Sequence, residues 1–66
     1  MNAKNTKFAI APEGNYIDLT PGKKYKITKW DDSKYFYILD NVGVNLFCCT
    51  TMCAHLNGKK WILRNK

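Results

Sequence analysis

The chain has 66 residues, of which 45% are hydrophobic and 14% aromatic, so it can form one domain with a thin core and is too apolar for a disordered tail. It carries 11 Lys and Arg residues against 5 Asp and Glu residues, a formal net charge of +6. A core this small leaves little room for a deep catalytic pocket. We therefore expect a single domain over residues 1–66 that is not an enzyme, with a frayed end at residues 1–5.

The composition of the N-terminal segment and the cysteines indicate the compartment. Residues 1–7 are polar and lack the apolar segment of a signal peptide. No apolar run approaches the roughly 20 residues that span a bilayer. Three cysteines without a secretion signal are typical of reduced thiols. We expect a cytoplasmic protein that has no membrane partner.

The first third of the chain predicts a short strand followed by a long loop. Residues 6–11, TKFAIA, are apolar enough for an edge strand, which Pro12 ends. The segment 12–22 then holds several turn formers around a short apolar piece. The turn formers are Pro12, Gly14, Asn15, Pro21 and Gly22, and the apolar residues are Tyr16, Ile17 and Leu19. This composition indicates a loop that is anchored to the core.

A period-two pattern over residues 23–29 predicts the first long strand. The side chains of one face are Tyr25 and Ile27, and those of the other face are Lys24, Lys26 and Thr28. Simple alternation places Trp30 on the lysine face, unless a bulge intervenes. The lysine face is therefore either a binding surface or the solvated side of a small sheet.

Two turns and two further strands complete a meander. Residues 31–33, DDS, predict a tight polar turn, and residues 34–40 predict a strand that is apolar on both faces. Asp40 and Gly43 are the preferred first and last residues of a type I turn, so a hairpin leads into a third strand over 44–50.

The segment before the last strand allows two structures. The dipeptide NG at 57–58 is a strong hairpin signal, which would pair residues near His55 with residues near Lys60. Alternatively, residues 52–56 form a single turn of 3-10 helix, and 59–63 form the last strand. Five short strands in a chain of 66 residues predict an all-β fold, either a small barrel or a curled sheet.

Three segments of the chain resemble small SH3-like barrel proteins of bacteriophages and prophages. In that pattern a Leu, a Pro-Gly turn and a Tyr open the first long strand, a Tyr-rich strand ends in an Asp-Asn-x-Gly turn, and a Cys-x-His-Leu turn leads to a Gly and a Trp. The matching segments are LTPGKKYKI, YFYILDNVG and CAHLNGKKWIL, within about residues 16–63. The resemblance implies a five-stranded SH3-like barrel with a short 3-10 turn before the last strand. It also implies a phage or prophage protein in the cytoplasm of a bacterial host, and it carries no site residues.

The cysteines and the histidine do not predict a metal or catalytic site. Cys48, Cys49, Cys53 and His55 are residue types that bind zinc, but adjacent Cys48 and Cys49 point to opposite faces of a strand and cannot easily hold one ion. A Cys53–His55 nucleophile and base would need an orienting partner and an oxyanion site. We expect one core, one surface and one turn cysteine, with no metal, no cofactor and no catalytic residue.

The candidate binding surface combines aromatic side chains with lysines. If Phe36 and Ile38 point into the core, Tyr35 and Tyr37 lie outside, because successive side chains alternate across a strand. Exposed aromatics among lysines form a stacking platform for single-stranded nucleic acid. Alternatively, the 12–22 loop covers these tyrosines. The predicted surface consists of Lys24, Lys26, Trp30, Tyr35, Tyr37, Lys59 and Lys60.

The type of basic residue indicates how such a surface would bind. All basic residues except Arg64 are lysines, which suit phosphate backbones better than base edges. We predict a small non-catalytic basic module that binds nucleic acid, preferably single-stranded, with weak sequence selectivity. The alternatives are a module that binds or inhibits a bacterial host protein, or an accessory of an oligomeric assembly. The sequence allows a monomer or a small homo-oligomer.

Overall fold

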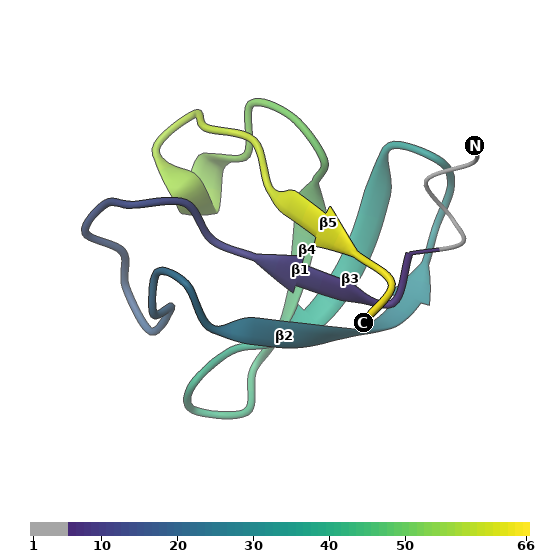
Figure 1. Cartoon of the computed structure of the whole chain (residues 1–66), viewed down its shortest axis with the longest axis horizontal. Coiled ribbons are helices and arrows are strands. Elements are labelled where there is room, and N and C mark those ends of the chain that lie inside the picture. The colour runs from purple at the N-terminus through teal and green to yellow at the C-terminus, as the bar shows by residue number, and fades with distance from the viewer. Residues whose placement is uncertain (1–5) are drawn as a thin grey trace.

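The computed structural model describes residues 6–66 and shows an antiparallel sheet of five strands in the order β4-β3-β2-β1-β5 (Figure 1). The strands are β1 (Phe8–Ile10), β2 (Lys24–Trp30), β3 (Tyr35–Leu39), β4 (Asn45–Cys49) and β5 (Ile62–Arg64). A 3-10 turn, η2 (Ala54–Leu56), precedes β5. The predicted all-β class, the five strands and the 3-10 turn are confirmed. The predicted frayed end, residues 1–5, lies outside the described residues.

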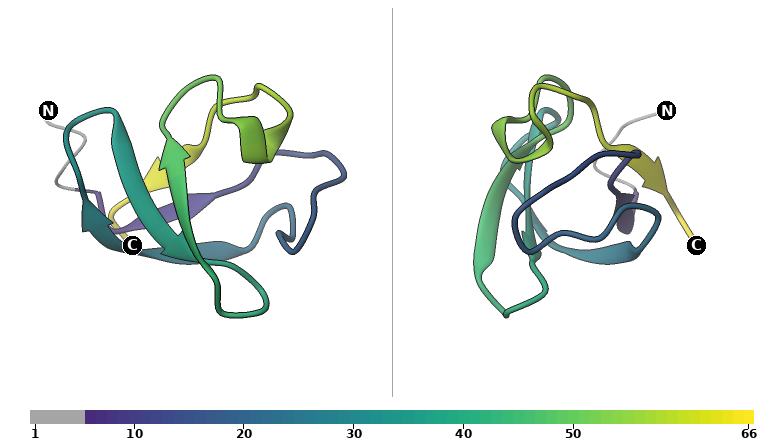
Figure 2. Two further views of the ribbon diagram at one scale, coloured as in Figure 1. Left: turned by 180° about the vertical axis from the view of Figure 1, so that it is seen from behind. Right: turned by 90° about the vertical axis from the view of Figure 1, so that its left-hand side faces the viewer.

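The sheet bends over its own interior because β2 belongs to both of its halves. The first part of β2 pairs with β1, and its last residues pair with β3. Figure 2 shows β1 and β5 on one side of the interior and β3 and β4 on the other. The edge strands are β4 and β5. Thr50, the residue after β4, accepts the Trp61 N–H at its carbonyl at 3.1 Å, and Trp61 is the residue before β5.

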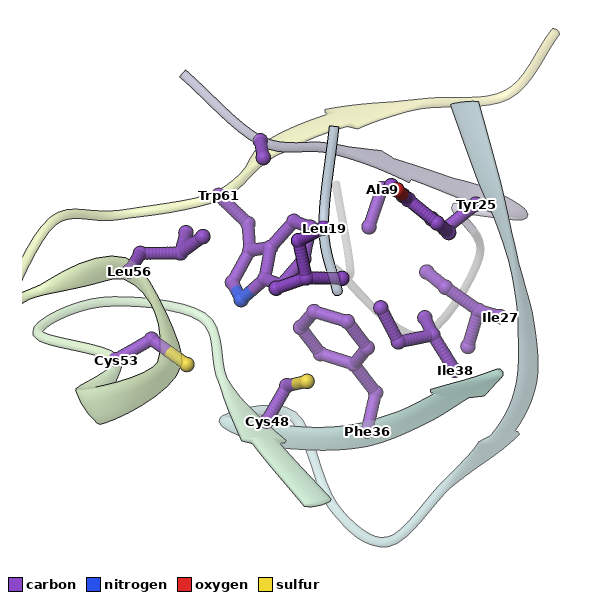
Figure 3. Packing of buried hydrophobic residues seen from close by; sticks show 11 residues of the cluster. Ala9, Leu19, Tyr25, Ile27, Phe36, Ile38, Cys48, Cys53, Leu56 and Trp61 are labelled. Carbon is purple, nitrogen blue, oxygen red and sulfur yellow. The ribbon is translucent and has the colours of Figure 1, made fainter. Parts of the chain in front are cut away.

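The interior is filled by side chains from β1 to β4, the 12–22 loop, η2 and the residues that flank η2 (Figure 3). The Phe36 ring lies near the centre of this core, with its centroid 5.0 Å from that of Trp30 and 5.8 Å from that of Trp61. Tyr25 meets Trp61 edge to face at 6.4 Å. The buried residues are Ala9, Ala11, Leu19, Tyr25, Ile27, Phe36, Ile38, Cys48, Cys53, Leu56 and Trp61.

The prediction that residues 6–11 form an edge strand is wrong. β1 lies between β2 and β5, with Ala9 opposite both Tyr25 and Leu63. Ala9 is 0% exposed, because two strands flank it and the core lies beneath it. A short apolar strand is stable here since its backbone groups find partners on both sides.

A bulge in β2 decides the side on which Trp30 lies. Ile27 is opposite Ile38, whereas Lys29 is opposite Tyr37, so Thr28 is one extra residue in β2. Because of this extra residue, Trp30 faces the core and not the lysine face that simple alternation predicts. Its indole Nε1 donates to the Thr6 carbonyl oxygen at 3.1 Å.

The two turns at the ends of β4 match their sequence signals. The Gly43 N–H donates to the Asp40 carbonyl at 3.1 Å, and the Asp40 carboxylate accepts the backbone N–H groups of Val42 and Val44. After β4, residues 54–56 form the 3-10 turn, and Asn57 has a left-handed φ of 57°. The 3-10 alternative therefore holds, and of the predicted hairpin one isolated antiparallel bridge is formed, between Cys53 and Lys59. No helix in the described part of the chain has the length and hydrophobicity of a membrane span.

The 12–22 loop is anchored, as its composition predicts. Leu19 is only 4% exposed and contributes to the core. The Asp18 carbonyl accepts the Asn41 N–H at 2.9 Å, and the Asn15 carbonyl accepts the Asn57 side-chain amide at 3.2 Å. These bonds tie the loop to the β3–β4 turn and to the end of η2. The ring contacts of the outer tyrosines, in contrast, are made by β4.

Candidate binding surface

Three aromatic rings form a row on the outer face of β3 and β4. Tyr35 stacks on Phe47 with ring centroids 5.2 Å apart and planes 20° from parallel. Tyr37 lies directly opposite Phe47 in the sheet, at a centroid distance of 5.3 Å and a tilt of 58°. Phe47 is 45% exposed, and the two tyrosines are half-buried. We call Tyr35, Tyr37 and Phe47 the aromatic patch.

Phe47 belongs to this patch, although the residue pattern of the sequence did not place it on the predicted surface. The signal was present in the turn at Asp40 and Gly43, whose length sets the register between β3 and β4. Leu39 opposite Asn45 then places Tyr37 opposite Phe47. This register places Phe47 on the same outer face as the two tyrosines. A register shifted by one residue would have turned its side chain toward the core.

Lys29 and Lys34 are the lysines that adjoin the aromatic patch. Lys29 is opposite Tyr37 in the sheet and is exposed, so its side chain emerges beside the patch. Lys34 and Tyr35 line a shallow hollow of about 90 Å³ together with residues 49–51. Neither lysine was in the predicted surface. The bulge at Thr28 brings Lys29 to this face, and Lys34 lies in the turn that precedes β3.

The predicted lysines of β2 lie on the other half of the sheet. Lys24 is opposite Ile10 and Lys26 is opposite Phe8, so both emerge on the outer face over β1. The Lys24 ammonium lies 5.5 Å from the centroid of the Phe8 ring, a cation–π contact. The structure therefore does not bring these two lysines against the aromatic patch, although all of them lie on the outer side of one sheet.

Lys59 lies beside the 12–22 loop. Its ammonium donates to the Glu13 carbonyl at 2.7 Å and lies 5.9 Å from the centroid of the Tyr16 ring. Lys60, the next residue, is exposed. These two predicted lysines thus lie near the 12–22 loop, while Trp30 is partly buried and packs against the core.

The strands carry positive charge and no carboxylate. Their charged residues are Lys24, Lys26, Lys29 and Arg64. The acidic residues Glu13, Asp18, Asp31, Asp32 and Asp40 all lie in loops and turns. Asp32 and Asp40 accept backbone N–H groups there, the local role that turns favour for Asp. The outer face of the sheet is consequently cationic and aromatic.

The cysteines alternate in burial around the end of β4. Cys48 is 0% exposed, Cys49 is half-buried on the outer face, and Cys53 is 1% exposed. The predicted core cysteine is confirmed, Cys49 is half-buried and packs against the core rather than lying freely at the surface, and the turn cysteine is also buried. Within residues 6–66, no group of three or more His, Cys, Asp and Glu side chains is placed to hold a metal ion.

The thiols of Cys48 and Cys53 shift each other's pKa inside the core, where the Cys48 thiol also donates to the Leu46 carbonyl oxygen at 3.7 Å. The interaction with Cys48 lowers the pKa of Cys53, and the Trp61 indole N–H contributes in the same direction. Within residues 6–66 the buried Trp61 Nε1 has no hydrogen-bond partner, and it points toward the sulfur atoms of Cys48 and Cys53 in Figure 3. The same interaction between the thiols, together with burial, raises the pKa of Cys48.

Thiol labelling should separate the three cysteines. We expect an alkylating reagent to modify Cys49 first in the folded protein, because Cys48 and Cys53 are inaccessible despite the lowered pKa of Cys53. Intact-mass spectrometry over time would show one rapid addition, and further additions only after denaturation. Cys49→Ser is the control and should lose the rapid addition. Equal labelling rates for all the thiols of the folded protein would contradict the burial.

The aromatic patch, with Lys29 and Lys34 beside it, is the feature of the described chain best suited to binding. A second hollow, of about 170 Å³, is lined by residues 15–17 and by Ala54, His55 and Asn57. His55 is exposed there while Cys53 is buried, so the two side chains lie in different environments. Comparisons with protein-family models, curated proteins and solved structures found no match to this chain.

Proposed function

We propose that this protein is a non-catalytic binding module of the SH3-like barrel type, of phage or prophage origin, that associates with single-stranded nucleic acid. The observation that carries the proposal is an outer sheet face with an aromatic patch and lysines but no carboxylate. The strand order and the 3-10 turn before β5 support the SH3-like assignment. Bacterial cytoplasm, as the site of phage nucleic acid, fits the free cysteines.

Bases would stack on the aromatic patch while lysines meet the phosphates. Ring faces accept any base, so stacking gives affinity with little sequence selectivity. Lys29 and Lys34 lie beside the patch, and Lys26 and Lys24 continue along the outer side of β2. The span from Lys24 to Lys29 is roughly 16 Å, at about 3.3 Å of rise per residue. This distance allows one strand of nucleic acid to contact both halves of the sheet.

The salt dependence of lysine variants and the affinity of an aromatic variant should separate phosphate contacts from base stacking. Changing both Lys24 and Lys26 to Gln should reduce the slope of log affinity against log salt by up to about 1.4, since each lost phosphate contact on a single strand contributes about 0.7. Tyr37→Ala should weaken binding by about 1–3 kcal/mol and leave that slope unchanged. Fluorescence titration with labelled oligonucleotides at several salt concentrations measures both quantities.

The control removes the same charge from the other end of the molecule. Lys59→Gln combined with Lys60→Gln should leave the salt slope closer to that of the original protein, because these lysines lie outside the proposed track. An equal loss from both double variants would show that net charge, and not the outer face of β2, attracts the nucleic acid. A dissociation constant weaker than about 10⁻⁴ M for all oligonucleotides would reject the proposal.

A protein partner is the second candidate, and exposed aliphatic residues favour it. Leu39 is 50% exposed, Val42 65% and Val44 51%, all at the end of the β3–β4 hairpin that carries the aromatic patch. Aromatic and aliphatic side chains together are typical of protein interfaces. Failure of nucleic-acid binding would therefore favour a bacterial host protein as the partner.

A further inference from the structure

The backbone of β4 presents free hydrogen-bonding groups at the edge of the sheet. The Thr50 N–H donates to the Lys34 carbonyl at 2.8 Å, and the Asp40 N–H donates to the Val44 carbonyl at 2.9 Å. Hydrogen-bonded pairs alternate along an antiparallel ladder. Even-numbered residues of β4 therefore bond to β3, and the N–H and C=O groups of Asn45, Phe47 and Cys49 point away from the sheet.

The outward groups of Asn45 and Phe47 have no partner within residues 6–66. The Cys49 N–H differs, because it lies beside the buried Cys53 thiol and contributes to the lowered pKa of that thiol. Two residues thus offer two donors and two acceptors, at alternate positions, on an edge that is open to another strand. Such an edge is a template for strand pairing.

β4 also lacks the features that protect sheet edges. Its sequence, NLFCC, contains no proline and no charged residue, lysine included. The opposite edge strand, β5, has three residues and ends in Arg64. Since β4 carries no charge, an acidic partner strand would find no complementary lysine along it, whereas a second uncharged strand would meet no repulsion there.

We propose that β4 pairs with β4 of a second copy of this chain, antiparallel about a twofold axis at Leu46. Asn45 then lies opposite Phe47 of the second copy, and each pair exchanges two N–H···O=C bonds. All the free donors and acceptors of Asn45 and Phe47 in both copies are used, and Cys49 is not required. This β4–β4 pairing does not depend on nucleic-acid binding.

The side chains around the axis suit this register. Leu46 is half-buried and would lie opposite its own symmetry mate, in the closely spaced type of antiparallel pair. Val44, which is 51% exposed, would lie diagonally across from Leu46 of the second copy. Phe47 of the two copies would approach each other on the outer face, so the two aromatic patches would adjoin.

The predicted dimer is weak and should strengthen with salt. An edge of a few residues buries less area than a permanent dimer needs, so we expect a dissociation constant between about 1 μM and 1 mM. Each copy has a formal charge of +6, and salt screens that repulsion. Nucleic-acid binding should respond to salt in the opposite direction, which keeps the two proposals distinguishable.

Asn45→Pro tests the backbone pairing without changing the aromatic patch. Proline removes the outward N–H of residue 45 but no ladder bond to β3, so the fold should persist. The dissociation constant should rise by about tenfold or more, since two hydrogen bonds are lost per dimer. Asn45→Ala is the matched control, because it removes the side chain and keeps the N–H. Sedimentation across a concentration series, without nucleic acid, measures the association, and circular dichroism checks the fold.

Amide hydrogen exchange of the unchanged protein gives a second test. The amides of Asn45 and Phe47 should become protected as concentration rises, while those of Leu46 and Cys48 should be protected at every concentration. A monomer at about 1 mM, or an Asn45→Pro variant that associates as strongly as Asn45→Ala, would overturn the proposal. So would association that leaves the Asn45 and Phe47 amides unprotected. An extended strand of another protein on this edge, with no self-association, would also overturn it.

Discussion

Replacing Trp61 by alanine should destabilise the protein by about 3–5 kcal/mol, the usual cost of removing a large aromatic side chain from a core. Trp61 is 4% exposed and meets Phe36 and Tyr25 edge to face. A domain of 66 residues has modest stability, so a loss of this size should leave a large fraction of the chain unfolded at room temperature. Urea denaturation followed by circular dichroism measures the change.

Ile17→Ala is the control for this experiment. Ile17 is 88% exposed in the 12–22 loop, so its truncation should change the free energy of unfolding by less than about 0.5 kcal/mol. Trp61→Phe should lose less stability than Trp61→Ala, because it keeps a ring against Phe36. An unchanged denaturation midpoint for Trp61→Ala would place the indole outside the core.

Ile38→Pro should abolish folding. Ile38 is 0% exposed, and β3 has a strand on either side, with Ile27 and Leu46 opposite Ile38. By the alternation along β3 and β4, the Ile38 N–H donates to the Leu46 carbonyl, and proline removes this donor from a central strand. Amide proton spectra and circular dichroism should show a disordered chain.

Asn45→Pro is the matched control for this prediction too. It introduces the same residue into the neighbouring strand at a position whose N–H points away from the sheet. Native spectra for Asn45→Pro and disordered spectra for Ile38→Pro would confirm the hydrogen-bond alternation. A folded Ile38→Pro variant would show that residues 35–39 are not a central strand.

Local signals predicted β2, β3, β4 and the β3–β4 turn correctly, whereas the last strand, predicted over 59–63, begins only at Ile62. Alternation over 23–29 depends only on neighbouring residues, and so does the turn between Asp40 and Gly43. The bulge at Thr28 left no such signal, because an extra residue in a strand does not alter its composition. Trp30 turns inward because its ring packs on Phe36, a contact between strands that alternation within one strand cannot predict.

Long-range pairing accounts for the errors in the rest of the chain. β1 was predicted at an edge because the sequence gives no sign that β5 pairs with the side of β1 that faces away from β2. The candidate surface was likewise assembled from residue types along the chain. In the structure these residues lie in separate places. Tyr35 and Tyr37 contact Phe47 of β4, whereas Lys24 and Lys26 are paired with β1. The lysines beside the tyrosines are Lys29 and Lys34.

The position of β1 between β2 and β5 has a consequence for the order of folding. The β2-β3-β4 meander joins segments that are close in sequence, so it can form early, whereas β1 and β5 pair across nearly the whole chain and must close a long loop. Until they do, Trp61 cannot cover Phe36, and the side of β1 that pairs with β5 stays open. A chain delayed at this step would expose both an apolar ring and a strand edge. Aggregation during slow refolding should therefore begin from the meander.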